Sequence, residues 1–279
     1  MVLGAEPDDN SRHPDHQTQR RADLGVLDRF RLDGKIALVT GGARGLGWEI
    51  ALSLAEAGAR VAVTSRDPET ARAAGQKLLK ITGQNCIGLA CEVSDPRSVE
   101  EAVTQVRQQL GPVQILINNA GINIRGPIQN LSLEQFRSVM DTNVTGVWLM
   151  CRAAARDMLE ERWGRVVNVG SILSSVGLEE RTPYTSAKGA VIQMTRTLAL
   201  EWACSGITVN CLCPGPFGTE MNRPLMDDRE KYAAFVSKIP MRRFGNLEEI
   251  GPAVVFLASE ASSFVTGSAL YVDGGWTAQ

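Results

Sequence analysis

The chain has 279 residues, of which 44% are hydrophobic and 22% charged, and its formal net charge at pH 7 is -2. This length can bury a core large enough for one α/β domain. The nearly balanced charge gives no electrostatic case for nucleic acid or an anionic membrane as partner. No apolar run approaches the roughly 20 residues that span a bilayer, and acidic residues interrupt the N-terminus where a signal peptide would be apolar. We therefore expect a cytoplasmic protein without a membrane or nucleic-acid partner.

Residues 1–31 are expected to form a mobile polar tail, because they are rich in Asp, Arg, Gln and Pro and lack apolar periodicity. Both histidines, His13 and His16, lie in this tail. Acid–base chemistry in the folded body must then fall to Tyr, Lys, Asp or Glu, and we expect no metal site. We expect all six cysteines to be small buried side chains of a reducing compartment. Cys211 and Cys213 are expected to point to opposite faces of a strand.

From residue 33 onward, short apolar runs alternate with helical patterns. The expected strands are residues 36–40, 60–65, 86–90, 114–118, 165–170, 207–212 and 269–272. The expected helices are residues 46–57, 68–81, 96–110, 133–162 (read as two helices), 183–204 and 247–257. The strands are continuous and β-branched, as strands buried on both faces are. The alternation predicts one α/β domain over residues 32–279, a Rossmann-type doubly wound sheet of about seven parallel strands with helices on both faces.

One segment interrupts this alternation of strands and helices. Residues 217–244 are rich in charge and methionine and lie between the sixth strand and the last helix. Long insertions at such positions are commonly functional loops. We therefore expect a lid-like insertion or a substrate-binding subregion there.

The first strand leads through a glycine-rich run directly into a helix. Gly41, Gly45 and Gly47 have the spacing G-x-x-x-G-x-G. Glycines allow a tight turn and let a pyrophosphate approach the helix N-terminus, where free N–H groups and the helix dipole attract anions. The strand before the run and the helix after it predict a dinucleotide site, which would include Arg44 and Leu46. The alternative is a glycine-rich turn without a ligand.

The end of the second strand bears on which dinucleotide binds. An acid at this position would hold the 2′-hydroxyl of NAD, but Ser65 and Arg66 stand there. A guanidinium suits a 2′-phosphate by bidentate geometry, and Arg44 could reach the same phosphate. We therefore predict that NADP(H) is preferred and that NAD(H) is possible. Asp67 is the opposing argument, because it could serve as a displaced acid.

Tyr184 and Lys188 stand four residues apart, a spacing that places both on one face of a helix. A nearby cation favours the phenolate form of a tyrosine. Such a tyrosine can give a proton to a carbonyl oxygen or take one from an alcohol near neutral pH. Ser171 lies at the end of the fifth predicted strand, on the sheet edge where ligands of parallel sheets bind. An ordinary surface Tyr–Lys pair is the alternative.

Over residues 32–279 the chain resembles the short-chain dehydrogenase/reductase family, in its shorter, single-domain branch. The motifs that carry the resemblance occur in order along the chain: the three glycines, Asn118-Asn119-Ala120-Gly121, Asn143, Ser171, Tyr184 with Lys188, Pro214-Gly215 with Thr219, and residues 271–275. One departure is Glu92-Val93, where the family usually has Asp-Val in contact with adenine.

The resemblance implies a division of labour in a metal-free oxidoreductase. Tyr184 would be the general acid/base, with Lys188 tuning it and binding the nicotinamide ribose. Ser171 would position the substrate oxygen, and Asn143 would hold a water that links Lys188 to solvent. The implied cofactor contacts are Gly41, Arg44, Gly45, Leu46, Gly47, Ser65, Arg66, Glu92, Val93, Asn119, Ala120, Gly121, Tyr184, Lys188, Pro214, Gly215, Phe217 and Thr219. A non-catalytic cofactor sensor is a remote alternative, because Ser171, Tyr184 and Lys188 are all present.

Local features favour a sugar acid or polyol, such as gluconate or 5-keto-gluconate, as the substrate. Residues 119–127 and 215–222 resemble gluconate 5-dehydrogenase-type members, and Arg125 could meet a carboxylate alongside Ser171 and Tyr184. The charged run 179–182 also favours a polar substrate. The alternatives are reduction of a 3-oxoacyl thioester on acyl carrier protein, and an Arg125 that simply faces solvent.

Two helical segments bear on assembly. Residues 150–155 and 199–203 are apolar on more than one face, which suits burial against a neighbouring subunit. Members of the family commonly form tetramers through these helices, so a homotetramer is expected. Helices that cover the sheet within one monomer would give part of the same pattern.

Overall fold

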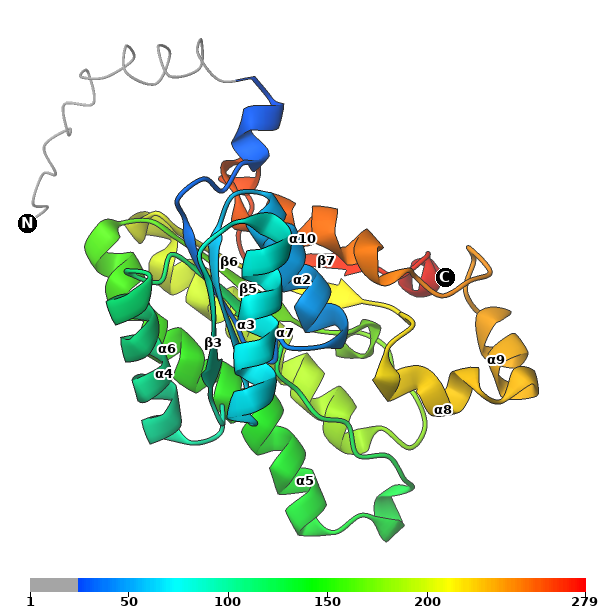
Figure 1. The fold of residues 1–279 in the computed structure, drawn as a ribbon. Coiled ribbons are helices and arrows are strands. Elements are labelled where there is room, and N and C mark those ends of the chain that lie inside the picture. The colour runs from blue at the N-terminus through cyan, green and yellow to red at the C-terminus, as the bar shows by residue number, and fades with distance from the viewer. Residues whose placement is uncertain (1–24) are drawn as a thin grey trace, which may run out of the picture.

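The computed structural model describes residues 25–279, and residues 1–24, with both histidines, lie outside the described part. Its centre is one parallel sheet with the strand order β3-β2-β1-β4-β5-β6-β7 (Figure 1). The strands are β1 Ile36–Val39, β2 Arg60–Ser65, β3 Cys86–Ala90, β4 Ile115–Asn118, β5 Gly164–Val169, β6 Ile207–Pro214 and β7 Ala269–Val272. The predicted fold class is confirmed.

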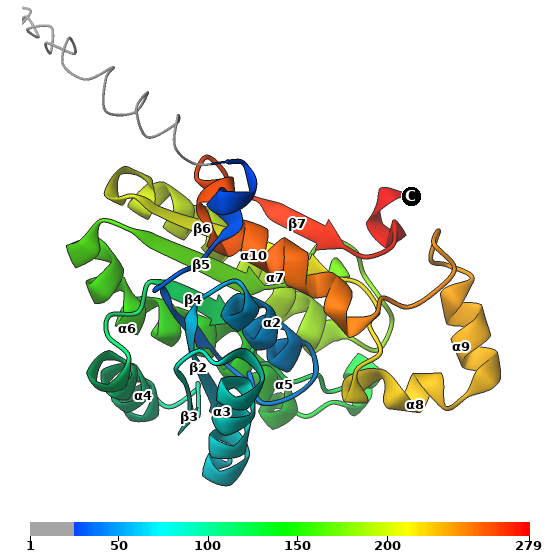
Figure 2. The same cartoon turned by 45° about the horizontal axis from the view of Figure 1, so that its top comes forward.

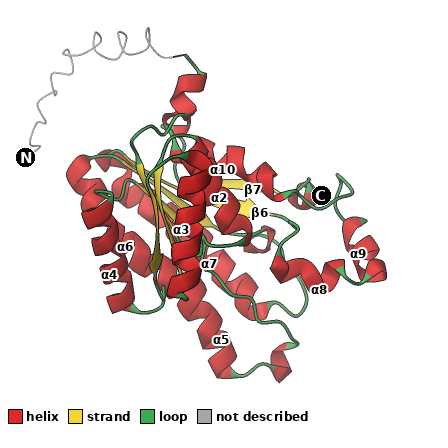
Figure 3. Cartoon of the chain, in the orientation of Figure 1, coloured by secondary structure: helices red, strands yellow, loops and turns green. Residues whose placement is uncertain are grey.

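Helices cover both faces of the sheet (Figure 3). The main ones are α2 Gly45–Glu56, α3 Pro68–Thr82, α4 Pro96–Gln109, α5 Leu133–Met140, α6 Gly146–Glu161, α7 Thr182–Trp202 and α10 Gly251–Ala258. Alternate residues of one strand enter different cores: Leu38 packs with α4, α6 and α7, whereas Ala37 and Val39 pack with α2 and α10. This alternation explains why the strands are apolar at every position.

The strand order fixes where a ligand can bind. The chain runs outward from β1 through β2 to β3, and it then returns to β4 on the other side of β1. Loops that follow β1 and β4 therefore diverge at the carboxyl edge of the sheet. This switch point is the usual ligand crevice of open parallel sheets.

The predicted helical region 133–162 contains two helices, as expected, joined without a loop. A π-helical turn, Asp141–Thr145, connects α5 to α6. Ser132 begins α5 with a capping box, in which its side chain and that of Gln135 bond each other's backbone N–H groups. A π-turn inserts one extra residue into a helix, and here it holds Asn143 fully buried.

The sixth strand is longer than predicted and runs to Pro214 instead of residue 212. Its last two residues, Cys213 and Pro214, pair with Tyr271 and Val272 of β7, and this pairing extends β6 toward the carboxyl edge of the sheet.

Near the start of the described residues, Leu27–Phe30 form a short 3-10 helix. The Phe30 ring lies 6.2 Å from that of Phe256 on α10, so the last residues of the predicted tail contact the domain.

Residues 217–244 contain two short helices, α8 Arg223–Met226 and α9 Arg229–Val236. Figures 1 and 2 both show them set off from the layers that cover the sheet. Aromatic contacts hold this segment to the body, because the Phe235 ring stacks on Trp276 at 4.8 Å. Figure 2 also shows the C-terminus close to the end of β7.

Two expectations for cysteine are wrong. The sulfurs of Cys211 and Cys213 lie 3.6 Å apart, on the same face of β6. Side chains alternate with a period of two, so residues two apart share a face. Cys204, in the 3-10 turn Ala203–Ser205 that follows α7, is exposed rather than buried. Within residues 25–279 no group of three or more His, Cys, Asp or Glu side chains is placed to hold a metal, and no helix could span a membrane.

Candidate active site

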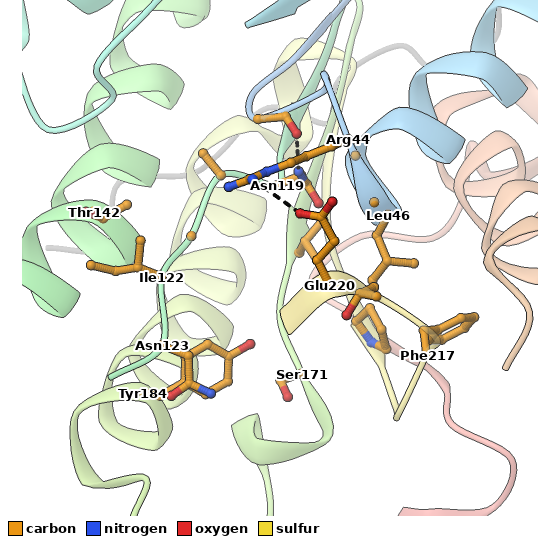
Figure 4. A pocket seen from close by; sticks show the side chains of 18 of the residues that line it. Arg44, Leu46, Asn119, Ile122, Asn123, Thr142, Ser171, Tyr184, Phe217 and Glu220 are labelled. Carbon is orange, nitrogen blue, oxygen red and sulfur yellow. Dashed lines mark hydrogen bonds and ion pairs between the residues drawn. The ribbon is translucent and has the colours of Figure 1, made fainter. Parts of the chain in front are cut away.

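A cavity of about 880 Å³ lies at the carboxyl edge of the sheet (Figure 4). Its walls come from the glycine-rich loop, the end of β2, the loop after β4, the start of α7 and the segment after β6. The structure brings the following predicted site residues to this cavity: Gly41, Arg44, Gly45, Leu46, Gly47, Ser65, Arg66, Glu92, Val93, Asn119, Ala120, Gly121, Arg125, Ser171, Tyr184, Lys188, Pro214, Gly215, Phe217 and Thr219. Asn143 does not line it.

The glycine-rich loop closes tightly on the loop after β4. Gly41 and Gly45 have φ values of 61° and 56°, in the left-handed region that glycine adopts without strain. A Cβ on Gly47 would lie 2.3 Å from the Gly41 carbonyl oxygen and 2.4 Å from Asn119 Nδ2. Asn119 Nδ2 donates to the carbonyl oxygens of Thr40, at 2.9 Å, and Gly41, at 3.1 Å. The two loops therefore leave no room for a side chain at Gly47.

The residues around the start of α2 fit a dinucleotide pyrophosphate. A Cβ on Gly45, the first residue of α2, would meet nothing within 4 Å, so the wall is open there. The free N–H groups of a helix N-terminus favour an anion. The buried hydroxyl of Thr64, close by at the cavity, has no hydrogen-bond partner among the described residues. An open helix terminus and an unsatisfied hydroxyl are features that a bound ligand would complete.

Ser65, Arg66 and Asp67, at the end of β2, all line the cavity, and Asp67 also caps the next helix. Asp67 is the N-cap of α3 and accepts hydrogen bonds from the Thr70 backbone N–H, at 2.8 Å, and from the Thr70 hydroxyl. The bond from the Thr70 side chain is the main reason that the pKa of Asp67 lies below its usual value. Its carboxylate is thus already used in capping.

Arg44 and Glu220 bridge the cavity between the glycine-rich loop and the segment after β6. Arg44 Nη1 lies 3.3 Å from Glu220 Oε2 (Figure 4). Both side chains are mostly exposed, at 76% and 69%. Exposed pairs of this kind are weak, about 0–1 kcal/mol, so Arg44 can exchange this partner for another anion.

The side chain of Glu92, where the sequence departs from the family pattern, is hydrogen-bonded within the turn that follows β3. Its Oε1 accepts hydrogen bonds from the backbone N–H of Ser94, at 3.2 Å, and from the Ser94 hydroxyl, at 2.8 Å. Val93 is buried against Gly146, where a Cβ would lie 2.8 Å from the valine side chain. The longer acid therefore orders the turn while both residues line the cavity.

Ser171, Tyr184 and Lys188 surround the same space. Figure 4 shows Ser171 and Tyr184 at the lower end of the cavity. Lys188 Nζ lies 5.6 Å from the centre of the Tyr184 ring and donates to the carbonyl oxygen of Val169 at 2.6 Å. Ser171 Oγ accepts from the backbone N–H of Leu173 at 3.1 Å. The end of β5 and the first turns of α7 thus bring a hydroxyl, a phenol and an ammonium together.

Asn143 lies behind the cavity wall. Its Oδ1 accepts from the Ile122 N–H at 2.8 Å, and its Nδ2 donates to the Ile122 carbonyl at 2.9 Å. Both ends of the amide therefore hold the loop after β4, next to Gly121. This contact positions the loop, and the water-relay role stays a prediction.

Sequence reasoning missed several residues that line the cavity. These are Asn123, Leu178, Arg181, Asn222, Leu225 and Phe235. The charged run 179–182 was a signal for Arg181, although no single residue could be chosen from it. The others come from loops and from the segment 217–244, whose path the sequence does not specify.

Comparison with known proteins agrees with this geometry. A family model described as "Enoyl-(Acyl carrier protein) reductase" matches residues 41–277. The chain is 40% identical over 246 residues to the 3-oxoacyl-[acyl-carrier-protein] reductase FabG of Vibrio harveyi, covering 88% of this chain and 98% of that protein. It is 39% identical over 250 residues to gluconate 5-dehydrogenase of Gluconobacter oxydans, covering 90% and 97%.

A solved structure of a related enzyme is also similar to this chain over nearly its full length. A gluconate 5-dehydrogenase from Burkholderia cenocepacia J2315, in complex with NADP and tartrate, matches with a TM-score of 0.88 and 37% sequence identity, over 91% of this chain and 100% of that one. The sheet, the glycine-rich loop and the Ser, Tyr and Lys around one cavity define an NAD(P)-dependent oxidoreductase that acts on CH–OH groups. The chain belongs to the short-chain dehydrogenase/reductase family.

Proposed function

We propose that the protein uses NADP(H) to interconvert a secondary alcohol and a ketone on a sugar acid or polyol, with gluconate and 5-keto-gluconate as the best candidates. One observation carries the proposal: Ser171, Tyr184 and Lys188 line the same cavity as the glycine-rich loop. A proton-transfer group and a dinucleotide can therefore meet at one substrate. We also propose a cytoplasmic location.

The cofactor preference rests on the end of β2. Ser65 and Arg66 line the cavity there, with Arg44 on the adjacent loop. A guanidinium offers a 2′-phosphate two parallel hydrogen bonds. Asp67, the residue that could favour NAD, is engaged as the cap of α3. NADP in the related Burkholderia structure supports the same preference.

When bound, a nicotinamide dinucleotide supplies or accepts the hydride at the reacting carbon. In the reductive direction, the Tyr184 hydroxyl gives its proton to the carbonyl oxygen, and in the oxidative direction it takes that proton back. Ser171 Oγ already accepts from Leu173, so its own hydrogen is available to donate to the same substrate oxygen. Lys188 has three N–H groups and uses one on Val169. The remaining two would bind the hydroxyls of the nicotinamide ribose and support proton transfer at the Tyr184 phenol.

The remaining residues shape the site. Asn143 would hold the loop of Asn119, Ala120 and Gly121 in place and carry a water toward Lys188. A Cβ on Gly215 would lie 2.6 Å from Asp273 Cα, so the segment after β6 packs against the closing run of the chain. This packing would set the position of Pro214, Phe217 and Thr219 at the nicotinamide end. Residues 217–244 would act as the lid.

A second candidate substrate is a 3-oxoacyl thioester carried by acyl carrier protein. The relatives support both candidates, at 40% identity for the thioester reductase and 39% for the gluconate enzyme. Two arginines that line the cavity, Arg125 and Arg181, favour the sugar acid. The test is NADPH consumption with 5-keto-gluconate and with an acetoacetyl thioester, repeated with NADH. Faster turnover of the thioester would contradict the sugar-acid assignment, and equal use of NADH would contradict the NADP preference.

We further propose a homotetramer built through α6 and α7. Trp148 on α6 and Leu200 on α7 are large apolar side chains that remain 48% and 83% exposed in the single chain. Burial of such side chains stabilises association. Light scattering coupled to size-exclusion chromatography measures the assembly directly, and a monomeric mass would contradict the proposal.

A further inference from the structure

The turn that carries Ser171 is closed by a second serine. Ser171 precedes the short 3-10 turn Ile172–Ser174, and the two serines form a capping box. Ser174 Oγ accepts a hydrogen bond from the Ser171 backbone N–H at 3.2 Å, and the Ser174 backbone N–H donates to the Ser171 carbonyl oxygen at 2.9 Å. Ser174 therefore holds both polar groups of the Ser171 backbone.

The same turn orients the Ser171 side chain. Ser171 Oγ accepts a hydrogen bond from the Leu173 backbone N–H at 3.1 Å. A serine hydroxyl has one hydrogen to donate, and an Oγ that accepts from within the turn can direct this hydrogen outward. Ser171 lines the cavity, so the hydrogen can be directed at an oxygen bound there. The geometry of this donor thus depends on the turn that Ser174 closes.

Ser174 itself lies behind the cavity wall. The three residues before it line the cavity, whereas Ser174 does not. A Cβ on Gly170 would lie 3.0 Å from Ser174 Oγ, and 2.6 Å and 2.9 Å from the sulfurs of Cys211 and Cys213. These three side chains surround Gly170, so the Ser174 hydroxyl is packed in place beside the backbone of Ser171. Any effect of Ser174 on the reaction must therefore act through the turn.

We propose that Ser174 is a positioning residue of the reaction, whose hydroxyl holds the backbone of Ser171 so that the Ser171 hydroxyl donates to the substrate oxygen. The inference rests on the proposed function, because it takes over the role that Ser171 has there. A small misplacement of such a donor slows the chemical step, while the cofactor still binds. Loss of the Ser174 hydroxyl is therefore a loss in kcat.

The competing explanation is a contribution to folding stability alone, because capping hydroxyls stabilise a turn wherever it lies. The next residue, Ser175, offers a comparison within the same turn. Its hydroxyl is hydrogen-bonded to the hydroxyl of Tyr271 on β7, so it ties the turn to the sheet and not to Ser171. Ser175 does not line the cavity either. The two serines thus differ in the partner of the hydroxyl.

The test measures kcat for Ser174→Ala, Ser171→Ala, their double variant and the matched control Ser175→Ala, all in the full-length protein. The substrate is the ketone that the wild type reduces fastest with NADPH. Ser174→Ala should lower kcat about tenfold and leave KM for NADPH within about twofold of the wild type. Ser171→Ala should lower kcat about a hundredfold or more. Adding Ser174→Ala to Ser171→Ala should cost no more than about twofold, because no hydroxyl is left to position. Ser175→Ala should match the wild type.

Two results would overturn the inference alone. One is an unchanged kcat in Ser174→Ala, and the other is an equal loss from Ser174→Ala with and without the Ser171 hydroxyl, which would show a purely structural role. Wild-type activity in Ser171→Ala would instead contradict the proposed function, and the inference would fall with it.

A second measurement follows the hydrogen bond between the two serines without turnover. Hydrogen exchange of peptides that cover residue 171, read by mass spectrometry, reports how often the Ser171 N–H loses its partner. Faster exchange in Ser174→Ala, but not in Ser175→Ala, supports the inference even if neither candidate ketone is reduced, in which case only the proposed function fails. Exchange at the wild-type rate in Ser174→Ala would overturn the inference.

Discussion

Lys188 Nζ donates a 2.6 Å hydrogen bond to the backbone carbonyl oxygen of Val169, which ties α7 to the end of β5. The lysine side chain is only 4% exposed. A buried ammonium is costly to desolvate, and one hydrogen bond does not satisfy its three donors. The burial of the Lys188 ammonium is therefore better explained by a role in ligand binding and catalysis than by a contribution to folding stability.

The first prediction concerns this lysine. Lys188→Met should lower kcat about a hundredfold or more, because the ammonium that lies 5.6 Å from the Tyr184 ring and would bind the nicotinamide ribose is lost. The unbranched side chain of methionine fills a similar space, so the midpoint of thermal unfolding should change by only a few degrees. Steady-state kinetics and calorimetry measure the two effects. Lys77→Met, on the exposed face of α3 above Trp48, is the control and should keep full activity.

The second prediction concerns cofactor choice. Arg66→Ala should raise KM for NADPH about tenfold or more and leave KM for NADH nearly unchanged, because only the phosphorylated cofactor loses a charged hydrogen bond. The control is Arg72→Ala, which removes an arginine six residues further on, in α3. A parallel rise for both cofactors would show that Arg66 acts on the fold rather than on the 2′-phosphate.

The third prediction concerns the tight contact between the glycine-rich loop and the loop after β4. Gly47→Ala places a methyl group 2.3 Å from the Gly41 carbonyl oxygen, so the loop must move. We expect NADPH affinity to fall and the melting temperature to drop by several degrees. Gly177→Ala is the matched control, since a Cβ there meets nothing within 4 Å. If both variants bind NADPH like the wild type, the close contact at Gly47 does not shape the cofactor site.

The sequence predicted the fold well because its main signals are local. Apolar runs of β-branched residues form strands wherever both faces are covered, and the carboxyl ends of parallel strands then meet at one edge. Ser171 and the glycine-rich loop lie near each other because the observed strand order places β4 and β5 beside β1, an order that the sequence alone did not predict. The need for glycine at Gly47 could also be predicted from the sequence, because the backbone is crowded there and a larger residue would not fit.

Features that depend on loop paths could not be predicted in this way. The loop after β4 and the start of α7 are distant in sequence, and the Glu180 carbonyl joins them by accepting hydrogen bonds from the Gly126 backbone N–H and from Arg181, a contact that no residue pattern predicts. The π-turn that buries Asn143 likewise has no residue type that marks it. The error at Cys211 was different, because the alternation rule itself places residues two apart on one face.

The fourth prediction follows from the cysteines. Burial raises the pKa of the Cys91 thiol to about 11 and that of Cys151 to about 12, so neither is a thiolate at pH 8. Cys204 is exposed. An aromatic disulfide reagent should therefore label one thiol per native chain rapidly at pH 8, and Cys204→Ser should abolish that fast phase. Rapid labelling that persists in Cys204→Ser would contradict the burial of the other cysteines.

The most direct test of the account is the activity of Tyr184→Phe, measured together with its affinity for NADPH. Removing one hydroxyl from a half-buried ring should leave NADPH binding, followed by fluorescence titration, within about twofold of the wild type. Turnover of the best ketone substrate should fall by about 10²-fold to 10⁴-fold, because the proton donor is gone. A variant that binds NADPH and turns over the ketone at the wild-type rate would contradict the assignment of Tyr184 as the acid/base and, with it, the proposed mechanism.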